Sequence, residues 1–167
     1  TTVIAIGMVR NIAPEASGSG IPHLEGVLRR LREMRWRRIL PVKFIGGALA
    51  IGGGLALGRE GPTVQMGGAV GAAVSEFLKV STRERFTLIA SGSGAGLAAA
   101  FNAPLAGFIF VLEELQRDFR RGVFAAALVA AAVADILARS VSGQLPVFAV
   151  PSYETPPLTT LPVFVLL

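Results

Sequence analysis

The sequence contains no cysteine, a single histidine and few charged residues for its length. Of its 167 residues, 16% are charged, whereas about a quarter of the residues of a typical soluble domain carry charge. The absence of cysteine excludes disulfides and thiolate chemistry, and one histidine cannot form a histidine-based metal cluster. The sequence therefore predicts neither an enzyme nor a catalytic residue, a metal site or a cofactor.

Apolar residues take the place of the missing charge. They make up 52% of the chain, and the mean hydropathy is +0.61. The net charge of +5 could indicate a nucleic-acid partner, but the basic residues cluster between apolar runs, as at 29–38, "RRLREMRWRR". That placement is typical of membrane proteins, and the aromatic and basic interleaving of nucleic-acid surfaces is missing. We predict a multi-pass integral membrane protein whose partner is the lipid bilayer, with no nucleic acid.

The apolar runs are of two kinds. A spanning helix needs about 20 apolar residues, and residues 121–139 meet this length. Residues 40–78 are interrupted at Arg59 to Pro62, and residues 86–115 at Asn102 to Pro104. Each interrupted run predicts a pair of short helices that meet at a break inside the bilayer, in an all-α protein. Such breaks are tolerated where protein or water covers the backbone, and paired breaks mark the binding sites of transporters.

The loops predict an orientation. The basic residues 29–38 are expected in the cytoplasm. If each interrupted run crosses the membrane once, residues 79–85 lie outside, 116–121 lie inside and 140–160 lie outside.

Three prolines share one local pattern: "SGSGIPHLEG", "LGREGPTVQM" and "AAFNAPLAGF". Proline is favoured in the first turn of a helix, and the preceding glycines permit tight turns. We therefore expect helix N-termini at Pro22, Pro62 and Pro104. A helix N-terminus presents free N–H groups and partial positive charge. Two such ends aimed at one point would form an anion site without a full cation, which would bind too tightly for rapid passage.

The same segments carry a family resemblance. "GSGIP" at 18–22, "GREGP" at 58–62 and "GLAAAFNAPLAGFIFVLEEL" at 96–115 resemble the three signature regions of the N-terminal half of the CLC family, which comprises chloride channels and chloride/proton antiporters. The resemblance implies re-entrant short transmembrane helices that form one half of an inverted-repeat fold. Residues 1–167 would be most of the first repeat, and the chain would be a piece of a longer protein.

The resemblance also implies roles for particular residues. Ser19 matches the serine that coordinates the central anion, beside the N–H groups of Gly20 and Ile21. Glu60 matches the gating glutamate, whose carboxylate competes with chloride and carries the proton in exchangers. The outer anion site would be lined by the amides of Arg59, Glu60 and Gly61. Glu114 matches the internal proton-transfer glutamate, and Glu113 matches its acidic neighbour on the water path.

The residues themselves leave plainer readings open. Glu60 could pair with Arg59 at a buried kink, and Ser19 could be an ordinary N-cap. Glu113 and Glu114 could face headgroups or pair with Arg117 at helical spacing. His23 is expected to be solvated. The glycines of "GSGAG" at 92–96 lack the lysine of a phosphate-binding loop and predict close helix packing.

Chloride/proton antiport is the favoured function, because many channel members of the family lack the acid at the position of Glu114. The alternatives are a passive chloride channel, a truncated fragment that transports nothing, and a sodium-coupled carrier. Serine at position 19 disfavours the fluoride-selective branch, which has methionine. The family implies a homodimer in a bacterial inner or plasma membrane. The second half would add a tyrosine hydroxyl opposite Ser19, and the only tyrosine here is Tyr153, after the last span.

Overall fold

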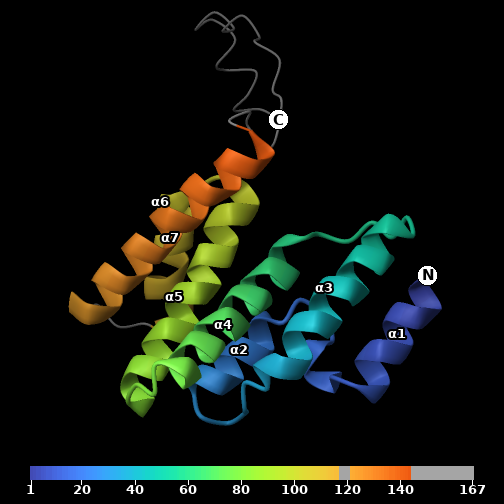
Figure 1. Cartoon of the computed structure of the whole chain (residues 1–167), viewed down its shortest axis with the longest axis horizontal. Helices are drawn as coiled ribbons and strands as arrows, with labels where there is room; N and C mark the ends of the chain where they lie inside the picture. Colours follow the sequence, from blue (N-terminus) through green and yellow to red (C-terminus); the bar gives the residue numbers. More distant parts are fainter. Residues whose placement is uncertain (117–120, 144–167) are drawn as a thin grey trace, which may run out of the picture.

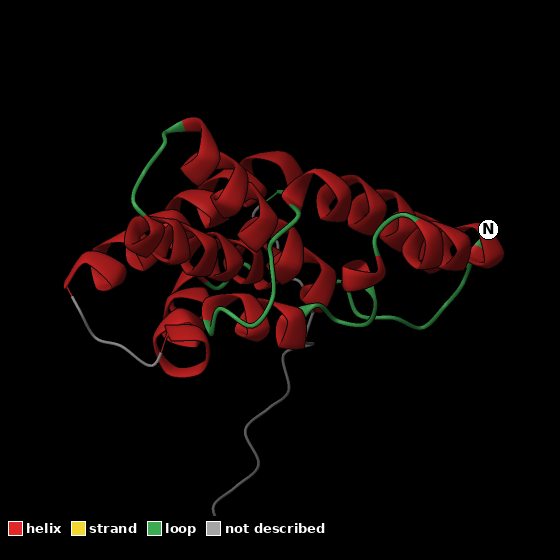
Figure 2. Ribbon diagram, turned by 90° about the horizontal axis from the view of Figure 1, so that it is seen from below, coloured by secondary structure: helices red, strands yellow, loops and turns green. Residues whose placement is uncertain are grey.

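The regular structure of the chain is entirely helical in the computed structural model, which describes residues 1–116 and 121–143 (Figures 1 and 2). The predicted all-α class is therefore confirmed for this part of the chain. In chain order the elements are α1 (Thr2–Asn11), η1 (Pro14–Ala16), α2 (Ile21–Leu28), α3 (Trp36–Gly52), α4 (Glu60–Phe77), α5 (Thr82–Phe101), α6 (Pro104–Phe110), η2 (Val111–Gln116) and α7 (Arg121–Ser142).

A break in each apolar run is confirmed, although the first lies earlier in the chain than the expected Arg59 to Pro62. The first run divides into α3 and α4, which are separated by an irregular segment at 53–59. The second divides into α5 and α6 at Asn102, which adopts a left-handed conformation with φ of 52°. The three prolines of the shared pattern fall in the first turns of α2, α4 and α6, as their missing N–H groups favour.

α4 and α5 pack through their glycines. A Cβ atom at Gly92 would overlap the carbonyl oxygen of Gly67, and one at Gly96 would overlap that of Thr63. The two backbones therefore approach as closely as glycine allows, which confirms the packing role predicted for "GSGAG". An apolar core next to this contact joins α2, α3, α4 and α5, with its fully buried members being Leu24, Ile39, Val64, Ala69, Ala72 and Ile89.

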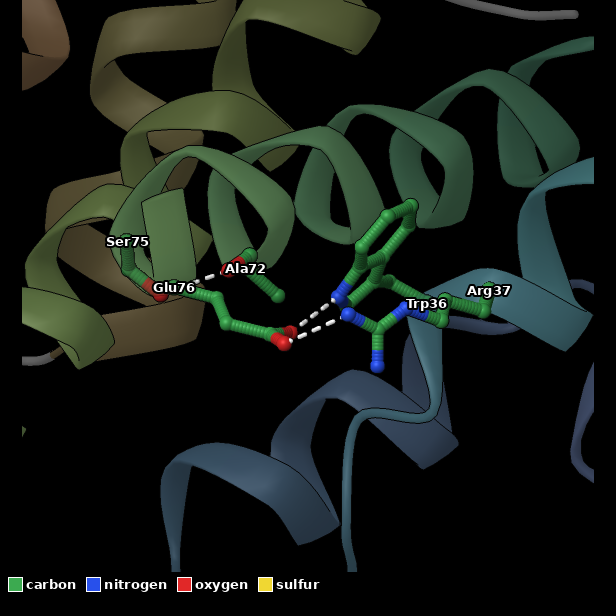
Figure 3. A network of polar contacts seen from close by, with 5 residues as sticks. All are labelled: Trp36, Arg37, Ala72, Ser75 and Glu76. Atoms are coloured by element: carbon green, nitrogen blue, oxygen red, sulfur yellow. Dashed lines mark hydrogen bonds and ion pairs between the residues drawn. The ribbon is translucent and has the colours of Figure 1, made fainter. Parts of the chain in front are cut away.

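A polar contact shows the relative direction of α3 and α4. The Trp36 indole Nε1 donates to one carboxylate oxygen of Glu76 at 2.7 Å, and Arg37 Nη2 donates to the other at 2.7 Å (Figure 3). The first turn of α3 therefore lies beside the last turn of α4, and the two helices are antiparallel (Figure 1).

The topology expected from the loops is consequently wrong at one point. Residues 29–38 and 79–85 lie at the same end of the molecule, because the segment at 53–59 is long enough to reverse the chain. Each interrupted run goes out and returns instead of crossing once. The start of α7 is at this end too, since Gly122 and Val123 line a cavity with Arg83 and Glu84. We call it the basic-loop end.

α7 is the predicted uninterrupted span. Within the described part of the chain, Gly122–Ser142 is the one helix that is long and apolar enough to cross a membrane. The sequence placed this span at 121–139, so its start is confirmed and its end lies one turn further on.

Candidate functional site

The loop before α2 and the first turn of α4 meet. A Cβ atom at Gly61 would lie 2.8 Å from both Cβ and the carbonyl oxygen of Ser19, closer than side chains pack. Gly61 therefore lies directly against Ser19, and only glycine permits this approach. Two of the three segments that the sequence singled out are in contact, although the chain passes through α2 and α3 between them.

The loop that carries Ser19 is shaped by left-handed glycines. Gly18 has a φ of 63° and Gly20, the N-cap residue of α2, has a φ of 90°, values that glycine reaches without strain. Gly20 also lies against the side chain of Gln65, which would be 2.5 Å from an added Cβ. Ile21 opens α2 and packs against the apolar core.

A cavity of about 730 Å³ extends from this contact toward α1 and α3. Most of its wall is apolar and comes from these two helices. Four polar residues line it near the Ser19 contact, Ser17, Ser19, Lys43 and Glu60, and Thr2 and Arg10 line it on the side of α1. A cavity with an apolar wall and a few convergent polar groups is the usual form of a small-ligand site.

Glu60 is the first residue of α4 and is half-buried at the cavity wall. Its carboxylate folds back over Gly58, so closely that a Cβ atom at Gly58 would overlap it. The neighbouring Arg59 turns elsewhere, because its Nη2 donates to the carbonyl oxygen of Ala100 at 2.9 Å. The alternative of an Arg59–Glu60 ion pair is thus not formed here, and Glu60 faces the cavity beside a helix N-terminus.

Lys43 brings a full positive charge to the same wall. It lies in the apolar run of α3 and is only 5% exposed. Its Nζ donates to the carbonyl oxygens of Ala16 at 2.9 Å and Gly18 at 2.6 Å. A buried amine needs such partners, and this one also braces the loop that presents Ser19.

Glu113 and Glu114 lie elsewhere. They occupy η2, a π-helical turn that continues α6, and both are exposed. Neither belongs to the lining of the cavity at Ser19 and Glu60. Buried Val111, Leu112 and Leu115 anchor the turn against α5 and α7. Arg117, the alternative partner considered for these acids, is outside the described residues.

A family model described as "voltage gated chloride channel" matches residues 1–167, the entire sequence. The chain belongs to the voltage gated chloride channel family. The "H(+)/Cl(-) exchange transporter ClcA" of Vibrio parahaemolyticus is 51% identical over 163 residues, which are 96% of this chain and 35% of that protein. The protein of the same name from Citrobacter koseri is 45% identical, over 96% of this chain and 34% of its own.

Solved structures agree with the sequence relatives. The "slow cyanobacterial Cl-/H+ antiporter" matches with a TM-score of 0.87 and 37% identity, over 99% of this chain and 39% of that one. The chain thus has the fold of the corresponding part of a voltage gated chloride channel family protein. It spans about a third of the length of the curated relatives named above.

In this family member the structure brings together part of the predicted anion set. Ser19, Glu60 and Gly61 line the cavity, whereas their chain neighbours Gly20, Ile21 and Arg59 are not among its lining residues. Lys43 was missed by the sequence analysis. Its signal was visible, because a lone lysine inside the apolar run "ILPVKFIGG" marks a functional position in membrane segments by default.

The expectation for His23 is wrong. It is 5% exposed, and its Nδ1 lies 3.3 Å from Nε2 of Gln65, which also donates to the Glu15 carbonyl oxygen at 2.9 Å. Because an amide nitrogen only donates, Nδ1 of His23 is the acceptor of this bond. α2 packs the face that carries His23 against α4, so the imidazole lies between these two helices instead of facing water. Tyr153 is outside the described residues.

Proposed function

We propose that the full-length protein exchanges chloride for protons across a bacterial inner or plasma membrane, as a multi-pass homodimer. The observation that carries the proposal is the contact of Gly61 with Ser19 at a cavity that Glu60 also lines. The names of the similar proteins, exchange transporters and an antiporter, agree with it.

In this mechanism the anion is held by neutral donors. The Ser19 hydroxyl and the N–H groups of Gly20 and Ile21 would donate to a central chloride, and those at the start of α4 would donate to an outer one. Helix N-termini suit anions because their N–H groups lack partners within the helix. The charge of Lys43 makes the potential in the cavity more positive and favours anion entry.

Glu60 provides the gate. Its carboxylate and a chloride are attracted to the same positive helix end, so each excludes the other. When the carboxylate takes a proton, it loses its charge and leaves that position to chloride. One group thus ties anion occupancy to proton binding, which is the requirement for exchange.

Glu114 supplies the internal end of the proton route, with Glu113 beside it. Both lie in η2, outside the lining of the Ser19–Glu60 cavity. A proton route that is separate from the anion route would let Glu114 take up a proton from water while Glu60 competes with chloride. Exposure of Glu114 on η2 supports this role, because a relay group must reach water.

The proposal is tested with the full-length protein in liposomes, by recording chloride and proton fluxes together. We expect Glu60→Ala to keep chloride flux and lose proton coupling, and Glu114→Gln to move anions without protons. Glu33→Gln is the matched control, because that side chain is 81% exposed on the basic loop, and it should behave as the wild type.

Each alternative has its own result. Chloride flux without protons in the wild type would make the protein a passive channel, and no flux would make it a non-transporting protein. Unchanged pH-driven chloride uptake in Glu60→Ala would remove the gate assignment. A wild-type flux ratio in Glu114→Gln would remove the internal proton assignment.

A further inference from the structure

The C-terminal end of α5 binds two arginines from different parts of the chain. The last carbonyl groups of a helix have no partner within it and carry partial negative charge. At α5, Arg59 Nη2 donates to the Ala100 carbonyl oxygen at 2.9 Å, and Arg139 Nη2 donates to that of Asn102 at 2.8 Å. Basic side chains commonly cap helix C-termini, but here the two caps come from the loop before α4 and from the far end of α7.

Arg139 is held in place by a buried acid. Its Nε donates to Oδ2 of Asp135 at 2.8 Å, one turn earlier on α7, and the Asp135 side chain is 9% exposed. A buried carboxylate needs a partner of opposite charge. The planar guanidinium therefore bonds a carboxylate through one nitrogen and the Asn102 carbonyl through another, and the single nitrogen of lysine would not match this spacing.

The two capped carbonyls lie next to the segments that carry the transport glutamates. Arg59 directly precedes Glu60 in the chain. Asn102 is followed by Ala103, the N-cap residue of α6, and α6 continues without interruption into η2 and Glu114. The C-terminal end of α5 is thus hydrogen-bonded to the segment that carries Glu60. It is followed in the chain by the segment that carries Glu114.

We propose that this end of α5 is a joint that keeps the proton and anion steps linked, with Arg59 and Arg139 as its positioning residues. The inference rests on the proposed exchange function. A displacement at the start of α4 would pull on Ala100 through Arg59, and the turn at Asn102, fixed to α7 by Arg139, would pass the strain to α6. Without the joint, the segments of Glu60 and Glu114 would move independently.

Simple anchoring of α7 is the competing explanation, and the flux ratio separates the two. An anchor that only stabilises the fold would lower the melting temperature and leave the number of protons moved per chloride unchanged. A joint would lower that number, even though Arg139 contacts neither glutamate in the described structure.

The test uses the full-length protein in liposomes, with chloride and proton fluxes measured on the same samples. The paired variant Asp135→Asn/Arg139→Gln removes both charges together, so that no buried carboxylate is left unpaired. We expect its proton-to-chloride ratio to fall below that of the wild type. Arg59→Met should lower the ratio similarly, and Arg139→Lys, which keeps the charge but places its donors on one nitrogen, should be intermediate.

Arg83→Gln is the matched control, since Arg83 is exposed in the first turn of the same helix, at its opposite end. Its ratio should equal that of the wild type. Wild-type ratios in the folded paired variant and in Arg59→Met would overturn the joint. If the paired variant does not fold, Arg139→Lys decides: a lowered ratio supports the joint and a wild-type ratio overturns it. A wild type without proton coupling would instead refute the exchange function itself.

Discussion

The basic side chains around the cavity and the α5–α6 break have different hydrogen-bond partners from those at the basic-loop end. Around the cavity and the α5–α6 break, Lys43, Arg59 and Arg139 donate to main-chain carbonyl oxygens, and Arg139 also pairs with the buried Asp135. At the basic-loop end, Arg35 and Arg37 pair with carboxylates on the surface. Residues of the same type therefore do two kinds of work. Around the cavity and the α5–α6 break they hold irregular backbone in position. At the basic-loop end they form ion pairs on a solvated face.

The difference should appear in the energetics. The Arg37 and Glu76 side chains are 71% and 45% exposed, and exposed ion pairs contribute little because water and salt screen them. Lys43 is buried, so its loss would strip two carbonyl groups of their donor. Leaving buried carbonyl groups without a hydrogen-bond donor lowers the stability of the fold far more than the loss of an exposed ion pair does.

Lys43→Met should have the largest effect. Methionine fills similar space but cannot donate to the Ala16 and Gly18 carbonyl oxygens. Because a hydrogen bond from a charged group contributes about 1.5–3 kcal/mol, we expect the full-length protein to lose stability by about that amount, and chloride to bind at least about tenfold more weakly. Thermal unfolding and calorimetric chloride titration measure the two effects. Lys79→Met, on the exposed loop, is the control, and equal behaviour of the two variants would erase the contrast between the regions.

Gly61→Ala should follow. The added Cβ would meet Ser19 at 2.8 Å, so the start of α4 and the Ser19 loop must separate. Overpacking of this kind costs about 1–3 kcal/mol, although alanine is intrinsically better in a helix than glycine. Chloride affinity should fall, as read by the same titration. Gly7→Ala is the control, because nothing lies within 4 Å of its Cβ; a Gly61→Ala protein that binds chloride normally would contradict the shared site.

Glu76→Gln should have a small effect. The amide oxygen can still accept from Trp36, so that only the charge pairing with Arg37 is lost. We expect a slight fall in melting temperature that disappears in high salt. A large, salt-independent loss of stability would show that the basic-loop end is held as firmly as the cavity.

The smallest effect concerns pH at the start of α5. Hydrogen bonds from the Ser81 side chain and backbone hold the pKa of the Glu84 carboxyl below its usual value. A carboxyl with a lowered folded-state pKa stabilises the fold above its unfolded-state pKa, and this contribution is lost as the pH falls through the folded-state pKa. Glu84→Gln should therefore melt earlier than the wild type at neutral pH, and the gap should close below about pH 4. A gap that persists in acid would contradict the assignment.

Local chemistry explains what the sequence could predict. The helix starts near Pro62 and Pro104 and the packing glycines of α5 depend on residues close together in the chain, so local patterns could predict them. The convergence of Ser19 with Gly61 was accessible through the family resemblance and through the logic of paired helix ends. The contact itself depends on how α2 and α3 fold the chain back.

Long-range packing explains what the sequence missed. His23 is buried because its partner Gln65 comes from α4, and no local pattern announces that pairing. The expected position of residues 79–85 was wrong because a break between two helices can reverse the direction of the chain. The sequence analysis had assumed that the chain continues in the same direction across the membrane. The carbonyl partners of Arg59 and Arg139 likewise lie about forty residues away, beyond the reach of any periodicity.

The central claim is that an anion binds between Ser19 and the start of α4. A bromide-soaked crystal of the full-length protein tests this claim directly. Anomalous scattering locates bromide, which substitutes for chloride. We predict a peak in contact with the Ser19 hydroxyl or with the N–H groups of Glu60 and Gly61, stronger in Glu60→Gln, in which the competing charge is gone. Bromide bound only elsewhere, or a seat left vacant in both proteins, would contradict the account.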